Sequence, residues 1–547
     1  MILGQPRLAA LRELAADVTV IGSGPVGIVT ALALADRGFR VLVLESGGAG
    51  PGPASDDLAV ADSFDPDHHF EPHTAVARRL GGTSNLWAGR CVPFDPIDFR
   101  ARPWLGLDAA WPIGEGDLAP YLAPALAALG AGEAVFTAPV PGVAADAAFR
   151  CDTLERWTNQ PRIHKLHARA LAERQDLTVA LRTTVTGFRY GPDGSIAGLE
   201  VATGEGRGEI PAARVVLAAG AAEAGGVACL LVEEEPGAGG AGGPLGRFYM
   251  GHLSGQIADV VFENQALHDA LDYHVDAHGS YVRRRLVPSD ATQAEERLAN
   301  VAFWPVVPPI ANSAHRSGPL SAVFLALSLA PLGRRLIAEP VRLKHVGRPP
   351  WRRGAHLANV VRDLPRTLGF APAFLWKNRV AKMRIPGFFL ANSAGRYGLE
   401  YHSEQRPDPE SRLTLADARD RLGQRRLRID LRFGAEDAAS VLRAHAALET
   451  WLARNRLARL DYYAAGPEAR AAAVLANARD GAHQVGTIRM GREPGGGVVD
   501  GRCRVFGTPG LHVVSTAVLP TSGQANPTLT AVQLGLRLAD DIAGGRG

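Results

Sequence analysis

The feature that most constrains the fold of this chain is a glycine-rich turn near its start, flanked by two apolar segments. Residues 17–22 read DVTVIG, a run that predicts a short buried strand. The chain continues as GSGPVG and then as an apolar stretch at helical spacing, which stops at Gly38. Residues 39–46, FRVLVLES, predict a second buried strand. The segment is therefore a βαβ unit, which favours an α/β fold with a parallel sheet.

The glycines Gly22, Gly24 and Gly27 have the spacing GxGxxG, and each has a physical role in such a turn. The first permits the tight turn, the second lets the backbone approach a pyrophosphate, and the third lets the helix pack on the sheet. The helix N-terminus then offers N–H groups to the phosphates. Glu45 ends the second strand, where a carboxylate can accept ribose hydroxyls. Together these features predict a dinucleotide site, with a chance glycine-rich turn as the alternative.

Composition excludes several other classes of protein. Apolar residues make up 46% of the 547 residues and charged residues 21%, which is typical of a globular protein of two to four domains rather than of a disordered or fibrous one. The 62 glycines and 38 prolines exceed average usage and predict many tight turns. The four cysteines lie far apart without a CxxC pair, so we expect neither a disulfide framework nor a metal site.

The charge of the chain is unevenly distributed. The net charge is +3, but residues 334–384 contain 13 Lys or Arg and two acids, a local charge of +11. Aromatic residues such as Trp351 and Phe370 interleave with this basic cluster. We expect a helical lid here. Its basic face is explained either as solvated surface or as a contact with an anionic substrate, an acidic partner or a membrane surface.

The location of the protein follows from two further patterns. No apolar run reaches the roughly 18–20 residues that a membrane-spanning helix needs. The first 17 residues lack the basic and then apolar pattern of a secretory leader. We therefore expect a cytoplasmic protein.

Two later segments favour a flavin over a nicotinamide at the dinucleotide site. Residues 178–185 and 210–220 predict strands that lead to a turn of small residues, where backbone can lie close to an extended cofactor. Residues 504–542 predict a strand, a turn and a long helix. A nicotinamide-binding domain does not need this additional strand and helix so far along the chain.

At this point the sequence resembles the glucose–methanol–choline (GMC) oxidoreductases, which bind FAD, and especially their pyranose-oxidase-like branches. The resemblance rests on seven ordered blocks: residues 17–48, RRLGGTSNLWAGR at 78–90, WPIGEGDLAPYL at 111–122, VVLAAGAAEA at 215–224, LGRFYMGH at 245–252, EQRPDPESRLTL at 404–415, and HQVGTIRMG at 483–491 with the C-terminal strand and helix.

The resemblance implies a fold in two parts. A Rossmann-type FAD-binding domain would comprise residues 1–255 and 481–547. A second α+β domain, a sheet covered by helices, would comprise residues 256–480 and bind the substrate. The basic helical lid would lie near residues 319–384.

The resemblance also implies roles for individual residues. His483, in an H-x-x-G-T context, matches the family's catalytic histidine, and Asn526 in NPTLT matches the second active-site position. An imidazole can accept the hydroxyl proton of an alcohol, and an asparagine can orient that hydroxyl. The expected cofactor-binding residues are Gly22, Gly24, Gly27, Glu45, Gly81, Gly82, Thr83, Ser84, Asn85, Val185, Ala219, Thr516, Ala517, Pro527 and Thr528.

The glycine-rich loop departs from the family pattern at one position. Pyranose-oxidase-like members attach FAD through a histidine in this loop, and Leu86 stands in its place here. We therefore expect non-covalent FAD.

These features predict FAD-dependent oxidation of an alcohol group of a sugar, glycoside or polyol to the carbonyl, with hydride transfer to flavin N5. A bulky apolar alcohol such as a sterol or terpenoid is the alternative substrate, and a non-catalytic flavin-binding subunit is a remote alternative function. The electron acceptor stays open between O₂, a quinone and a protein. We expect no nucleic-acid partner.

Overall fold

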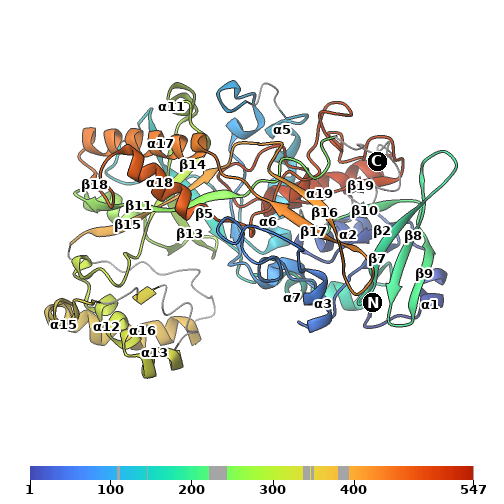
Figure 1. Cartoon of the computed structure of the whole chain (residues 1–547), viewed down its shortest axis with the longest axis horizontal. Helices are drawn as coiled ribbons and strands as arrows, with labels where there is room; N and C mark the ends of the chain where they lie inside the picture. Colours follow the sequence, from blue (N-terminus) through green and yellow to red (C-terminus); the bar gives the residue numbers. More distant parts are fainter. Residues whose placement is uncertain are drawn as a thin grey trace.

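The computed structural model describes residues 1–106, 111–144, 146–220, 243–336, 345–346, 350–379 and 394–545. In this part of the chain two large sheets lie end to end, each with its own hydrophobic core (Figure 1).

The first sheet is parallel and has the order β1-β6-β3-β2-β10-β19. Its strands are β1 (Ile2–Leu3), β6 (Leu177–Ala180), β3 (Val41–Leu44), β2 (Val18–Ile21), β10 (Val215–Leu217) and β19 (Leu511–Val513). The residues of β2, β3, β6, β10 and β19 are all buried, as expected for strands covered on both faces. From β2 the chain continues to β3 on one side and reaches β10 on the other, so the end of β2 is a topological switch point, where ligands bind.

Two helices pack against each other beside the first sheet. Helix α2 (Pro25–Asp36) follows β2, with Gly24 as its N-cap and Pro25 at its first turn. Helix α19 (Thr528–Ala543) returns from the C-terminal loops and contacts α2. A Cβ atom at Gly535 would lie 2.3 Å from the Thr30 hydroxyl, so the glycine permits this close approach.

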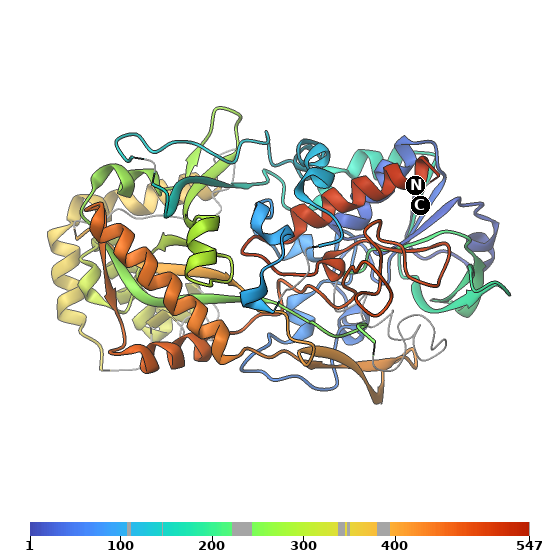
Figure 2. The same cartoon turned by 90° about the horizontal axis from the view of Figure 1, so that it is seen from above.

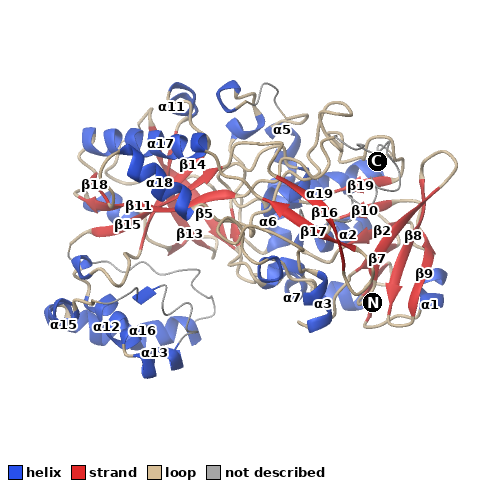
Figure 3. Cartoon of the chain, in the orientation of Figure 1, coloured by secondary structure: helices blue, strands red, loops and turns tan. Residues whose placement is uncertain are grey.

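The second sheet is antiparallel and has the order β18-β11-β15-β14-β13-β5-β4, with β12 paired to β13. Its strands are β18 (Ala458–Tyr462), β11 (His252–Phe262), β15 (Arg396–Glu404), β14 (Val301–Val306), β13 (Tyr281–Pro288), β5 (Phe149–Trp157), β4 (Arg90–Cys91) and β12 (His274–Val275). Helices α17 (Ala435–Arg454) and α18 (Pro467–Asn477) lie along one face (Figure 3). Val441, Ala444, Leu448 and Trp451 recur at helical spacing and pack into the core of this sheet.

Smaller elements surround these layers. A three-stranded sheet of β7 (Thr184–Tyr190), β8 (Ile196–Thr203) and β9 (Gly206–Pro211) lies beyond the first sheet, and β16 (Arg412–Arg419) pairs with β17 (Arg425–Asp430). The remaining helices near the first sheet include α1 (Leu8–Glu13), α3 (Pro53–Leu58), α5 (Glu115–Leu118), α6 (Leu122–Leu129), α7 (Ile163–Leu166) and α8 (Ala168–Glu173).

A separate helical group lies at the end of the molecule opposite to the first sheet (Figure 2). It consists of α12 (Gly318–Ser328), α13 (Ala330–Leu336), α15 (Arg353–Arg362) and α16 (Leu364–Arg379). These helices belong to the segment expected to form a basic lid, of which residues 337–344, 347–349 and 380–384 lie outside the described residues. None of the helices in the described ranges is long and apolar enough to cross a membrane.

The α/β fold class is confirmed, with a parallel Rossmann-type sheet and a second sheet covered by helices. The division into residues 1–255 with 481–547 and residues 256–480 stays a proposal. Strands β4 and β5 belong to residues 1–255 but pair within the second sheet. In this proposal, therefore, the FAD-binding part contributes two strands to the second sheet.

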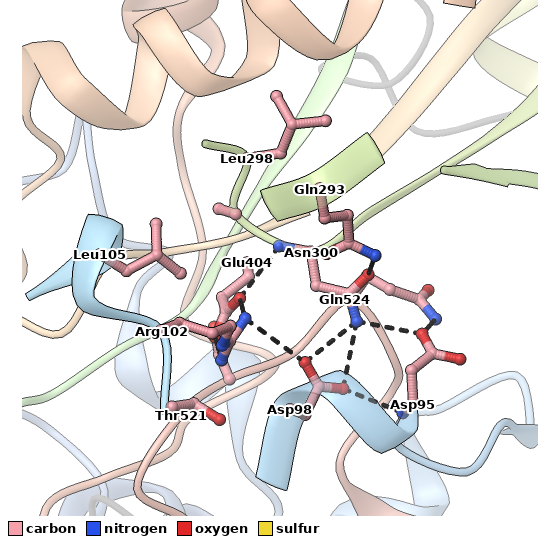
Figure 4. Close-up of polar contacts among 12 residues, drawn as sticks. Asp95, Asp98, Arg102, Leu105, Gln293, Leu298, Asn300, Glu404, Thr521 and Gln524 are labelled. Carbon is pink, nitrogen blue, oxygen red and sulfur yellow. Dashed lines mark hydrogen bonds and ion pairs between the residues drawn. The ribbon is translucent and has the colours of Figure 1, made fainter. Parts of the chain in front are cut away.

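A buried polar cluster joins the second sheet to the loops beside it (Figure 4). The Arg102 guanidinium donates to both carboxylate oxygens of Glu404, with Nη2 at 2.7 Å from Oε1, and both side chains are fully buried. The Asn300 side chain donates to Asp95 and Asp98 at 3.0 Å each. Gln524 donates to Asp95 at 2.8 Å, so the cluster also fixes the loop that leads to α19.

We expect Arg102→Ala to lower the free energy of unfolding by about 3–5 kcal/mol, because it leaves the Glu404 carboxylate buried without its cation. Urea denaturation measures this change. Arg7→Ala is the matched control, since Arg7 pairs with Glu205 on the surface, where ion pairs contribute little. An equal effect of the two variants would contradict the importance of the cluster.

Candidate active site

A cavity of about 1010 Å³ lies between the end of the first sheet and the second sheet. The β2–α2 turn, the end of β3, the loop of residues 82–88 and the C-terminal loops line one part of it. Side chains from β4, β5, β13, β14 and β15 line another part. The cavity is large enough for an extended cofactor together with a small molecule.

The glycines of the first turn are needed for three different reasons. Gly22 has a φ of +102°, a conformation that favours glycine. A Cβ atom at Gly27 would lie 2.0 Å from the Gly22 carbonyl oxygen, so this glycine permits the contact between helix and turn. A Cβ atom at Gly24 would meet nothing within 4 Å, and this residue lines the cavity. Gly24 therefore leaves space where a phosphate group can approach the N-terminus of α2.

Glu45 is buried at the end of β3 and already binds the turn. Its Oε2 accepts hydrogen bonds from the Ser23 backbone N–H at 3.1 Å and from the Ser23 hydroxyl at 2.6 Å. Its Oε1 accepts from the Gly47 N–H at 2.8 Å. A carboxylate has about four lone-pair positions, so capacity remains for a hydroxyl donor in the cavity.

Most of the residues predicted from the sequence line this one cavity. They are Gly22, Gly24, Glu45, Gly82, Thr83, Ser84, Val185, Ala219, Thr516, Pro527, Thr528, His483 and Asn526, and Leu86 lies with them.

Four predicted cofactor-binding residues do not line the cavity but support residues that do. Gly27 packs against Gly22. Asn85 donates to the backbone carbonyls of Leu80 and Gly82 at 3.0 and 2.8 Å and so holds the glycine-rich loop. The Gly81 N–H donates to the Ser23 carbonyl at 3.0 Å and the Ala517 N–H to the Ser515 hydroxyl at 3.1 Å, and both serines line the cavity.

His483 and Asn526 are direct partners on the cavity wall. The Asn526 amide Nδ2 lies 2.7 Å from His483 Nε2, so the amide donates to the imidazole lone pair. Asn526 Oδ1 is buried and has no hydrogen-bond partner among the described residues. An alcohol that entered the cavity could therefore donate its hydroxyl to Asn526 Oδ1, or to His483 Nε2 once it displaces the Asn526 amide.

The carboxylate of Asp480 holds the loop that carries His483. Asp480 Oδ1 accepts from the backbone N–H groups of Gly481, Ala482 and His483 at 2.7, 2.8 and 3.1 Å. Its Oδ2 accepts from the His252 N–H at 2.7 Å and lies 3.9 Å from His483 Nδ1. Burial raises the pKa of Asp480, but the contacts with His252 and His483 outweigh this effect and hold it well below its usual range.

Burial also sets the protonation of His483. It lowers the pKa of His483 to about 4, with Asp480 opposing this shift and His252 and Arg90 adding to it. The imidazole is therefore neutral at pH 7 and able to accept a proton. The carboxylate of Asp480 favours the imidazolium that would result.

Two buried histidines behind His483 were not predicted from the sequence. The rings of His252 and His402 stack with centroids 4.2 Å apart, and both lie edge-on to His483. His402 Nδ1 donates to the Gln524 carbonyl at 2.7 Å. Ligand atoms of the three histidines lie within 4.8 Å of one another, and the absence of a metal from the site stays a prediction.

Comparison with known proteins identifies the family. The family described as "GMC oxidoreductase" matches residues 407–535, and the family described as "FAD dependent oxidoreductase" matches residues 17–285. The chain therefore has the C-terminal domain of the GMC oxidoreductases and an FAD-dependent oxidoreductase domain. Its cofactor is accordingly FAD.

Similar proteins agree with this family. Over 62 residues, 11% of this chain and 12% of the relative, the chain is 45% identical to a C-glycoside 3-oxidase of Microbacterium trichothecenolyticum. Over 115 residues it is 35% identical to a paromamine 6'-oxidase of Streptomyces fradiae, covering 19% of this chain and 21% of the relative. The chain thus spans less than a quarter of the length of either relative.

The fold extends over nearly the whole chain. The crystal structure of a pyridoxine 4-oxidase from Mesorbium loti superimposes with a TM-score of 0.53 and 18% identity, covering 96% of this chain and 99% of that chain. This similarity supports the α/β architecture described above.

The cavity fits FAD. The space at Gly24, beside the N-terminus of α2, suits a pyrophosphate, and Glu45 suits a ribose. Val185, Ala219 and Thr516 line the same cavity.

Substitutions at Gly24 and Gly27 test directly whether the pyrophosphate of FAD binds beside the N-terminus of α2. We expect Gly24→Val to fold normally and to lose bound FAD, because its Cβ atom enters the space beside α2 with no protein atom within 4 Å. Gly27→Ala should lose both FAD and stability, since its Cβ meets the Gly22 carbonyl. Circular dichroism and flavin content of the purified variants measure these effects. Full flavin content in Gly24→Val would place the phosphates elsewhere.

Proposed function

We propose that this chain oxidises an alcohol group to a carbonyl, with His483 as the base and Asn526 as the orienting group. The observation that carries this proposal is the hydrogen-bonded pair of His483 and Asn526 in the same cavity as the β2–α2 turn. Bound FAD would accept the hydride of the alcohol carbon at its N5 position. The protein must then bind the alcohol, orient its hydroxyl and remove the proton.

His483 is suited to the proton transfer. Its Nε2 lone pair accepts from the Asn526 amide in this structure, and an alcohol hydroxyl that takes the place of this amide would donate to the same nitrogen. A pKa of about 4 keeps the base unprotonated over the neutral range. The activity should therefore rise with pH through the acidic range and level off, since only neutral His483 accepts the proton. The fixed carboxylate of Asp480 stabilises the imidazolium during this transfer.

A sugar, glycoside or polyol is the substrate class that we propose. Trp157, Tyr273 and Trp304 form aromatic walls of the cavity, with Arg283 and Glu400 beside them. Flat aromatic surfaces next to hydrogen-bonding groups suit the apolar faces and hydroxyls of a sugar. The similarity of part of this chain to a C-glycoside 3-oxidase supports the same substrate class. A bulky apolar alcohol is the alternative, and a flavin-binding subunit without turnover is a remote one.

We propose that O₂, a quinone or a protein accepts the electrons from the reduced flavin.

We also propose that the segment of residues 334–384 contacts a membrane or an acidic partner. Its described part exposes Leu357, Val361, Leu364 and Leu368 at helical spacing, alongside exposed arginines. No described residue of this segment lines the cavity, so the surface favours a peripheral contact over a lid. A cytoplasmic location stays a prediction.

We propose that FAD is bound without a covalent link. Leu86 lines the cavity at the position where related chains carry the attaching histidine, and its side chain has no nucleophilic atom. Acid precipitation should therefore leave the yellow colour in the supernatant. Colour that stays with the precipitated protein would overturn this part of the proposal.

We expect His483→Gln to retain FAD and to slow anaerobic flavin reduction by an alcohol about 10²–10⁴-fold, the usual contribution of a general base. Asp480→Asn should lose about tenfold for each pKa unit by which it destabilises the imidazolium. Stopped-flow absorbance measures both rates.

Asp500→Asn is the matched control for the second variant. Asp500 also accepts backbone N–H groups of its loop, from Arg502 and Arg504, but its carboxylate pairs with the Arg504 side chain and not with a histidine. Rapid flavin reduction in His483→Gln would show that another group accepts the proton.

A further inference from the structure

Two largely buried arginines on the substrate side of the cavity share one buried carboxylate. Arg90 on β4 and Arg283 on β13 both line the cavity, and their side chains are 12% and 5% exposed. Glu155 on β5 lies between them and is fully buried. The positive charges of Arg283, Arg90 and Arg285 all act on this one carboxylate.

Arg283 has its hydrogen bonds filled by the protein. Its Nε donates to Glu155 Oε1 at 2.6 Å, and its Nη2 pairs with the same oxygen. Its Nη1 donates to the Tyr273 hydroxyl at 3.0 Å. Each of the three guanidinium nitrogens of Arg283 therefore has a protein partner, and Arg283 supports Glu155.

Arg90 differs from Arg283 in this respect. Its Nε faces Glu155 Oε2 at 2.5 Å. Its Nη2 is buried and has no hydrogen-bond partner among the described residues. Since buried donors normally have partners, this nitrogen would gain one from an anion that binds beside Arg90 in the cavity.

The surroundings of Arg90 strengthen its attraction for an anion. Its guanidinium lies 4.5 Å from the centre of the Trp304 ring, and that of Arg283 lies 4.7 Å from the same ring. Aromatic walls exclude water and lower the local dielectric constant, so a charge acts more strongly there. Glu400 is the acid that also lines this region, and it accepts a hydrogen bond from Gln256 at 3.0 Å.

We infer that Arg90 binds an anionic group, a carboxylate or a phosphate, on the alcohol substrate. The inference rests on the proposed function and narrows the substrate class to acidic or phosphorylated sugars and polyols. A guanidinium matches the planar pair of oxygens of either group. Tyr273, Trp157 and Trp304 then contact the carbon chain between this group and the reacting hydroxyl.

A second consequence concerns the base. The charge of Arg90 is one of the influences that lower the pKa of His483. An anion bound to Arg90 offsets that charge, while the influences of Asp480 and His252 on His483 stay the same. The pKa of His483 in the substrate complex should therefore be higher with an anionic alcohol than with a neutral one. The acidic limb of the pH profile of kcat should lie at higher pH for the anionic member of a pair.

The test compares matched alcohols that differ in one charged group: glycerol with glycerate and glycerol 3-phosphate, and glucitol with gluconate and glucitol 6-phosphate. Anaerobic flavin reduction gives the second-order rate constant for each. We expect at least one anion to exceed its neutral partner by about 10–100-fold. The carboxylate and phosphate members distinguish the two kinds of anionic group.

Variants of Arg90 locate this preference. Arg90→Gln should reduce the ratio of the anionic to the neutral rate constant to near one, and Arg90→Lys should retain part of it. Arg247→Gln is the control, because Arg247 pairs with Glu410 and does not line the cavity. An unchanged ratio in Arg90→Gln would overturn the inference.

A measurement on the unaltered protein covers the case in which Arg90 variants fail to fold. Acetate and inorganic phosphate should inhibit reduction by a neutral polyol competitively, while chloride at the same ionic strength should not. If neutral alcohols reduce the flavin as fast as anionic ones and neither anion inhibits, the inference fails while the proposed function stands. If no alcohol of the panel reduces the flavin, the proposed function fails as well.

Discussion

The buried carboxylate of Asp480 is the interaction on which the geometry of the site depends. It accepts three successive backbone N–H groups and so fixes the loop that ends in His483. Its other oxygen accepts from His252, the first residue of β11 in the second sheet. One side chain therefore sets the position of the imidazole relative to both sheets and also supplies the charge that stabilises the imidazolium.

A second buried cluster determines where Asn526 lies. Arg102 and Glu404 neutralise each other without water, and Asn300 connects them to Asp95 and Asp98. Burial and the nearby charge of Glu404 raise the pKa of Asp98 well above its usual value, so this carboxyl holds a proton readily. Gln524, two residues before Asn526, is hydrogen-bonded to Asp95 and Arg285. The asparagine thus reaches His483 from a loop with little freedom to move.

The sequence predicted local features and failed on those that depend on tertiary packing. The βαβ unit was correct because its strands, its turn and Glu45 lie within 30 residues and follow local rules. The proposed FAD-binding part includes strand β5, and no local pattern reveals that this strand pairs with β13 in the second sheet. An aspartate three residues before His483 was visible, and its fit to an Asx turn could have drawn attention to it.

Buried polar residues were the hardest to predict. His252 and His402 occur in ordinary strand patterns, and only packing brings them beside His483. His69 stands in no motif of the sequence, yet it is buried and hydrogen-bonded to Tyr249. Arg90 follows the glycine-rich loop, and its sequence context does not indicate burial. Its burial follows from its neighbours Glu155 and Arg283, which come from other strands. Such side chains are stabilised by partners far away in sequence, which a single sequence does not reveal.

The most direct measurement of the account is an anaerobic titration of the purified yellow protein with a panel of sugars, polyols and their acids. The account predicts that at least one alcohol bleaches the visible flavin band stoichiometrically and yields the corresponding carbonyl product. A flavin that stays oxidised with every member of the panel, in a protein that retains its full FAD content, would contradict it.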